Sequence, residues 1–156
     1  MSYVITGLAR DEFAPLFALS DAALAERGVL RRTVDAKPGF PCRITLEDAE
    51  PGETVLLMNY EHQPADTPFR ARHAIFVREG EHATLRTVDA VPPALAARAH
   101  ISLRAFDAAG MIVGAEVAPG AALESPIERL LGRPDVAYIH AHYAGMGCYA
   151  ARIDRG

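Results

Sequence analysis

Apolar residues recur at every second position in several short segments of this chain, the pattern of strands that bury one face. In residues 42–47, for example, Cys42, Ile44 and Leu46 alternate with polar residues. Residues 54–60 are apolar on both faces, which is typical of a strand inside a sheet. The patterns predict a short opening strand over 4–8. They predict further strands over 29–35, 42–47, 54–60, 74–78, 101–107, 111–117, 136–142 and 148–153.

Turn-forming residues join most of these segments into hairpins. Pro51 and Gly52 occupy the central positions of a type II turn between 42–47 and 54–60. Ala108-Ala109-Gly110 suits a three-residue hairpin loop, and a glycine-rich loop separates the last two strands. Consecutive strands joined this way form antiparallel sheets.

Three short helices complete the expected elements. Ser20 is a candidate N-cap for a helix that ends at Gly28, and Pro92 and Pro93 open a second helix. Ser125 to Glu128 has the spacing of a capping box for the third. We therefore expect an α+β fold, a mainly antiparallel sheet of hairpin-connected strands with about three short helices, in a single domain over residues 1–156.

Composition narrows the classes of partner. Of the 156 residues, 50% are hydrophobic and 23% are charged, as in an ordinary globular domain. The net charge of −4 and the lack of a basic run argue against nucleic acid or a membrane as partner. No secretory signal is visible at the start of the chain, so we expect a cytoplasmic protein whose two cysteines are free thiols.

Several separate motifs together resemble one known family. They are Pro38-Gly39-Phe40-Pro41-Cys42-Arg43, Tyr60-Glu61-His62-Gln63, Ala74-Ile75-Phe76-Val77-Arg78, His140-Ala141-His142 and Gly147-Cys148-Tyr149. In this order they look like the bacterial domain of unknown function 1203. The resemblance implies a small single-domain bacterial protein and carries no assigned activity.

The last predicted hairpin holds the strongest cluster of reactive side chains. His140 and His142 are two apart on a strand and therefore project from the same face. Cys148 joins them only if the loop between the strands has an odd number of residues, most plausibly three or five. A four-residue loop would place Cys148 on the opposite face, unless a bulge intervenes.

Four interpretations of this cluster remain open. His140, His142 and Cys148 could bind zinc and leave the fourth position to water. Cys148 could instead be a catalytic nucleophile with His140 or His142 as its base. The histidines could line a pocket for a small anion without any chemistry. In the structural alternative, both histidines are hydrogen-bonded strand residues and Cys148 is a small buried hydrophobe.

A second candidate region is the polar segment 61–73, which we expect to be a long loop because of Pro64 and Pro68. Arg70 and Arg72 could both fork onto one carboxylate or phosphate, although their pairing with charges of the same loop is the simpler expectation. His62 follows a strand expected to be buried, and it would reach the face of His140 if the two strands are neighbours.

The sequence thus predicts a pocket for a small polar or anionic ligand, with or without zinc. Its walls would be the last hairpin, with His140, His142 and Cys148, and the segment that holds His62, Arg70 and Arg72. An interaction module that self-associates as a homodimer is one alternative. A cysteine-dependent enzyme using Cys148 is another, so whether the protein is an enzyme stays open.

Overall fold

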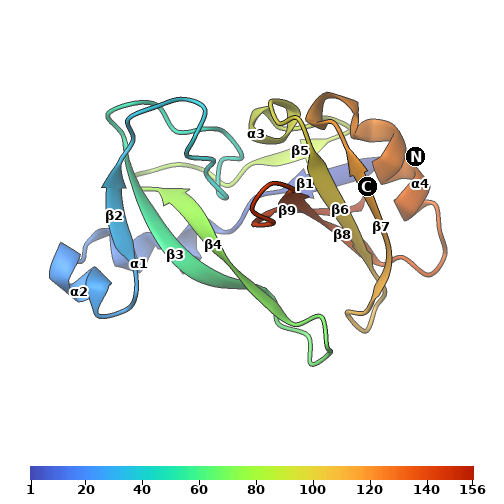
Figure 1. Cartoon of the computed structure of the whole chain (residues 1–156), viewed down its shortest axis with the longest axis horizontal. Helices are drawn as coiled ribbons and strands as arrows, with labels where there is room; N and C mark the ends of the chain where they lie inside the picture. Colours follow the sequence, from blue (N-terminus) through green and yellow to red (C-terminus); the bar gives the residue numbers. More distant parts are fainter.

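The computed structural model describes all 156 residues and confirms an α+β fold with two antiparallel sheets (Figure 1). The large sheet has six strands in the order β5-β1-β9-β8-β6-β7. Their bounds are β1 (Tyr3–Thr6), β5 (Arg86–Val88), β6 (Ile101–Phe106), β7 (Ile112–Ala118), β8 (Tyr138–Tyr143) and β9 (Tyr149–Arg155). The small sheet has the order β2-β3-β4, with β2 (Leu30–Thr33), β3 (Thr54–Gln63) and β4 (Ala71–Arg78).

The two faces of the large sheet have different partners. One face carries the main apolar core, in which Leu103, Ile139 and Ile153 pack with residues of the helix α4 (Glu124–Leu131) and with Leu95 of α3 (Pro93–Ala96). The alternate residues of β6 and β8 point to the other face, where His62 and Gln63 of the β3–β4 hairpin contact His140 and Tyr138 of β8. The polar positions of these strands are therefore enclosed between the two sheets.

The small sheet has its own core. Leu56, Met58, Ile75 and Val77 alternate along β3 and β4 and pack on Phe13, which precedes α1 (Ala14–Phe17). The helix α2 (Asp21–Ala25) lies beside β2 and is capped as predicted. The Ser20 side chain accepts a hydrogen bond from the Ala23 amide at 3.2 Å. The third predicted cap is not formed, since α4 begins at Glu124 without a side-chain cap.

Residues 42–47 do not form the predicted strand. They make a compact buried turn in which the Leu46 amide donates to Cys42 O, and Leu46 has a φ of 53°. Their alternating apolar residues are all buried, but Arg43 is buried between them as well. The apolar residues of this segment do alternate and are buried, but they belong to a turn and not to a strand. A turn that is enclosed on several sides can bury every side chain, so alternation here does not indicate a strand.

This turn is hydrogen-bonded to both sheets. The Arg43 amide donates to Phe76 O on β4 at 3.0 Å, and Arg43 O accepts from the Leu8 amide, just beyond β1, at 2.7 Å. Leu85, ahead of β5, donates to Ile44 O at 3.0 Å. The turn thus fixes the small sheet against the large one.

The β3–β4 hairpin is longer than predicted, so segment 61–73 is only partly a loop. β3 continues to Gln63 and β4 begins at Ala71, with a bulge between Glu61 and Gln63. The tip is bound to the large sheet, because Thr67 Oγ1 donates to Gly110 O at 3.1 Å and Gln63 Nε2 donates to the Tyr138 hydroxyl at 2.8 Å. The hairpin is therefore held at its tip as well as near its base.

None of the helices is long and apolar enough to cross a membrane.

We predict that Gly7→Ala destabilises the fold by about 1–3 kcal/mol, because the new β-carbon would overlap the Ile44 carbonyl oxygen and lie 2.9 Å from Arg43 O. Chemical denaturation measures the change. Gly145→Ala is the matched control, since a β-carbon there meets nothing within 4 Å. Equal stability of the two variants would show that the turn does not bind β1 this tightly.

Candidate metal centre

Four histidines from three strands meet where the β3–β4 hairpin crosses the large sheet. They are His62 on β3, His73 on β4, and His140 and His142 on β8. His62 Nδ1 lies 3.2 Å from His140 Nδ1, and His62 Nε2 lies 2.7 Å from His73 Nδ1. The expectation that His62 reaches the face of His140 is therefore met.

Strand register explains the meeting. His140 and His142 are two apart on β8 and share the face opposite the main core. On the small sheet, Tyr60 pairs with His73, and the register shifts between Glu61 and Gln63, so His62 lies at a bulge next to this pair. His62 and His73 of the small sheet therefore lie against His140 and His142 of β8, and the four imidazole rings pack together.

Three of the rings are placed to share one ion. One ring nitrogen from each of His62, His73 and His142 can be chosen so that all three lie within 4.8 Å of one another. In a tetrahedral zinc site, ligand nitrogens stand about 3.3 Å apart, so the separations between these nitrogens would shorten by at most about 1.5 Å on metal binding.

His142 has a ring nitrogen that no protein atom satisfies. Its Nδ1 is 2.9 Å from Gly147 O, so this nitrogen carries the proton and donates to the carbonyl. Nε2 then bears a lone pair, and it is buried without a hydrogen-bond partner. A buried acceptor with no donor is costly, and a metal ion would satisfy it.

His62 is similarly oriented by a second residue. Because a neutral imidazole has one donor and one acceptor, only one of its two close nitrogen contacts can use a proton of His62. If Nδ1 donates to His140, Nε2 is left as an acceptor that points toward His73. Metal-bound histidines characteristically donate their other ring N–H to a protein acceptor, as both His62 and His142 can here.

Burial keeps these rings neutral. Removal from water lowers the pKa of His142 to about 2, that of His140 to about 3 and that of His62 to about 4. The positive charge of Arg104 contributes to the lowering of all three pKa values, after the larger effect of burial. Neutral imidazole is the form that binds metal, so the lone pairs are available at pH 7.

Arg104 is a positively charged side chain beside the histidines that is free to bind an anion. It lies on β6 directly opposite His140 in the register, on the same face as the histidines. It is only partly buried and forms no ion pair or side-chain hydrogen bond. Arg104 has no carboxylate partner and lies beside the candidate metal site. This arrangement favours an anionic ligand that binds both the metal ion and the arginine.

Cys148 lies away from His140 and His142, contrary to the favoured geometry. The Tyr143 amide donates to Cys148 O and the Gly147 amide to Tyr143 O, which leaves a four-residue turn between the strands. A bulge on β9 then pairs Tyr149 with His142. Tyr149 occupies the position on the histidine face and stacks on His62 at 4.8 Å.

Cys148 instead lines a separate cavity, and no histidine is hydrogen-bonded to it. The three-ligand set of His140, His142 and Cys148 is thus not assembled. The thiol also forms no hydrogen bond to a base, as nucleophilic catalysis would need.

Arg70 and Arg72 both bind one carboxylate, as the sequence suggested, but this carboxylate is the side chain of Glu61 and not a ligand. Arg70 Nε donates to Glu61 at 3.0 Å, and Arg72 Nη1 lies 3.7 Å from the same side chain. Both arginines are more than half exposed. They form a surface ion-pair group apart from the histidines.

His73 and Arg104 are the site residues that the sequence did not single out. The alternation of Tyr60 with His62 was a usable signal that β3 continues, and it would have placed His73 in the returning strand. No local signal distinguishes Arg104 from any other arginine of a strand. Its importance depends on the neighbouring strand β8.

The fold and site define a class, namely two-sheet α+β proteins with a histidine cluster between the sheets. Residues 39–155 match the family model described as "Protein of unknown function (DUF1203)", and the chain belongs to this family. All four histidines and Arg104 lie within the matched segment. No curated protein and no solved structure matches the chain.

We predict that the rings of His62, His140 and His142 stay uncharged down to about pH 5 in the metal-free protein. In the unfolded chain they would titrate near pH 6.5, so the unfolded state binds more protons below that value. The free energy of unfolding should therefore fall as the pH drops from about 6.5 toward 4. NMR titration of the imidazole resonances measures the pKa values, with urea-unfolded protein as the control. Midpoints near 6.5 in the folded protein would contradict the prediction.

Proposed function

We propose that the protein binds a divalent metal ion of the zinc type through His62, His73 and His142, and binds a small anion at the metal with the help of Arg104. The observation that carries the proposal is the buried, unpartnered Nε2 of His142, which lies beside two further imidazoles. This proposal keeps the metal-assisted anion pocket expected from the sequence but changes its metal ligands. Cys148 is no longer one of them.

The donor set favours zinc. Three neutral imidazoles suit zinc better than calcium or magnesium, which prefer oxygen ligands. Three protein ligands also leave a fourth position for water or another ligand. When bound, the metal would supply a Lewis acid at that position.

Metal binding would also relieve two features of the cluster. The buried lone pair of His142 would gain a partner, and the ion would take the place of the proton shared between His62 and His73. His140 would accept the Nδ1 proton of His62 and so hold that ring in its ligating tautomer.

Arg104 supports an anionic ligand. Its positive charge weakens cation binding by the histidines, so its place in the site needs a reason that the metal alone does not supply. A small oxyanion held between the metal and the guanidinium would neutralise both, and such charge-assisted contacts are the strong ones.

We predict that the protein, purified without a polyhistidine tag, binds one equivalent of zinc by calorimetry and elemental analysis. His142→Ala and His73→Ala should each weaken binding more than about 100-fold, because each removes a ligand. His140→Phe should weaken it about 10–100-fold, because it removes only the acceptor for His62. His82→Ala is the control, since His82 lies outside the cluster.

Zinc binding that survives both ligand substitutions would contradict the proposal. Absence of metal together with a mass that rises with concentration would favour the self-associating module instead.

We further predict that Arg104→Met leaves metal binding intact or tighter and weakens anion binding about tenfold or more, because one charge-assisted contact is lost. The measurement is a titration of cobalt-loaded protein with inorganic phosphate, followed by the visible absorption of the metal. Arg129→Met is the control, since Arg129 pairs with Glu116 on the surface. An unchanged phosphate affinity in Arg104→Met would show that Arg104 does not bind the anion.

A further inference from the structure

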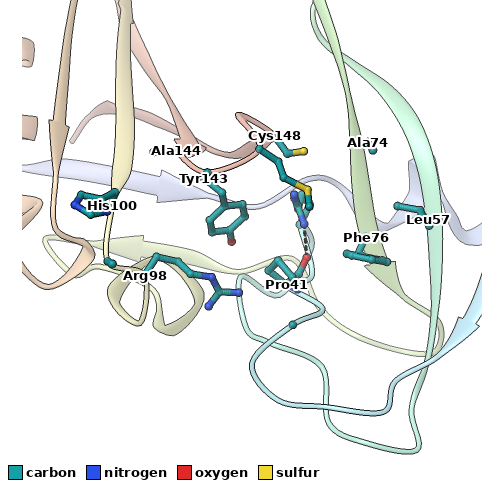
Figure 2. Close-up of a pocket in the computed structure, with 14 residues that line it drawn as sticks. Pro41, Leu57, Ala74, Phe76, Arg98, His100, Tyr143, Ala144 and Cys148 are labelled. Carbon is teal, nitrogen blue, oxygen red and sulfur yellow. Dashed lines mark hydrogen bonds between the residues drawn. The ribbon is translucent and has the colours of Figure 1, made fainter.

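A cavity lies beside the turn that follows β8, on the face of β8 that carries Tyr143 and not the histidines. Its volume is about 740 Å³, within the range of cavities that hold small organic ligands. Its walls come from the 39–43 segment, from Leu57 on β3, from Ala74 and Phe76 on β4, from the 98–100 segment and from the 143–148 turn (Figure 2). The proposed metal site makes no use of this space.

Arg43 is a buried cation without a counterion at this cavity. Only 3% of its surface is exposed. Nε donates to Tyr149 O at 2.8 Å and Nη1 donates to Pro41 O at 2.6 Å, and both acceptors are uncharged carbonyls. It forms no salt bridge, and its Nη2 has no hydrogen-bond partner in the protein. A buried charge in this state is expensive unless something neutralises it.

Tyr143 adds an unused hydroxyl beside this cation. The oxygen is buried and has no hydrogen-bond partner. The ring lies between two guanidinium groups, 5.0 Å from that of Arg43 and 5.1 Å from that of Arg98. In Figure 2 the Tyr143 side chain points its hydroxyl between Arg98 and Pro41.

Only one of the two guanidinium charges is neutralised. Arg98 donates two hydrogen bonds to Asp48, at 2.7 and 2.8 Å. No aspartate or glutamate lines the cavity. The polar end therefore keeps one excess positive charge, that of Arg43, with a free hydroxyl next to it.

The opposite wall is apolar. Leu57 on β3 and Phe76 on β4 are paired across the small sheet, and Ala74 follows on the same face. Figure 2 shows these three residues across the cavity from Tyr143. One end of the cavity thus suits an anion and the other suits hydrocarbon.

We propose that this cavity binds an organic monocarboxylate, with the carboxylate on Arg43 and Tyr143 and the apolar body against Leu57, Ala74 and Phe76. The excess of one positive charge matches one carboxylate. The free donors, Arg43 Nη2 and the Tyr143 hydroxyl, match its two oxygens. The proposal does not depend on metal at the histidine cluster.

The test uses octanoate as the probe, in calorimetry and in thermal unfolding of the full chain. Octanoate should bind saturably and raise the melting temperature, because it binds the folded state alone. Octan-1-ol lacks the charge and acetate lacks the apolar body, so both should bind at least about tenfold more weakly.

Three variants locate the probe. Tyr143→Phe removes only an unpartnered hydroxyl, so the protein should fold normally and bind octanoate about tenfold more weakly. Arg43→Met should weaken binding about tenfold to hundredfold. Ala74→Trp should abolish binding by filling the cavity from an exposed strand position. Tyr60→Phe and Val117→Trp are the matched controls, since both residues lie outside the cavity.

His142→Ala should leave octanoate binding unchanged, so failure of the metal proposal and failure of this one are distinguishable. The proposal is overturned if octanoate shows no saturable binding, if octan-1-ol or acetate binds equally well, or if Tyr143→Phe and Ala74→Trp both retain full affinity.

Discussion

The structure depends on the turn at residues 42–47, which hydrogen-bonds both to β4 and to the segments that adjoin β1 and β5. Its backbone accepts from the segment after β1 and donates to β4, so the small sheet cannot shift against the large one without breaking buried hydrogen bonds. The tip of the β3–β4 hairpin is bound separately through Thr67 and Gln63. Because the hairpin is held at both ends, its histidines lie against the face of β8 that carries His140 and His142.

Two neighbouring parts of the interior contain polar groups that are unusual there. Four imidazoles, the guanidinium of Arg43 and the Tyr143 hydroxyl are buried to different degrees, and none of them contacts a carboxylate. Interiors normally satisfy such groups with one another or with water. Here an imidazole lone pair and a phenol hydroxyl remain without partners, and both belong to the strand β8.

The β8–β9 hairpin supplies backbone carbonyl groups to both sites, one from its turn and one from the start of β9. Gly147 O fixes the tautomer of His142 on one side, and Tyr149 O holds Arg43 on the other. The four-residue turn and the bulge on β9 decide which side chains face each site, since they direct Tyr149 to the histidines and Cys148 to the cavity.

Local pattern in the sequence was enough for the fold class, most strands, the Ser20 cap and the shared face of His140 and His142, because these follow from backbone periodicity and capping chemistry. It could not determine on which face of the last hairpin Cys148 lies, because this depends on the length of the turn and on a bulge stabilised by packing. Nor could it show that residues 42–47 are a turn, that His73 and Arg104 join the histidines, or that Arg43 lacks a counterion. Those features depend on contacts between segments far apart in the chain, and only the packing of one sheet on the other brings such segments together.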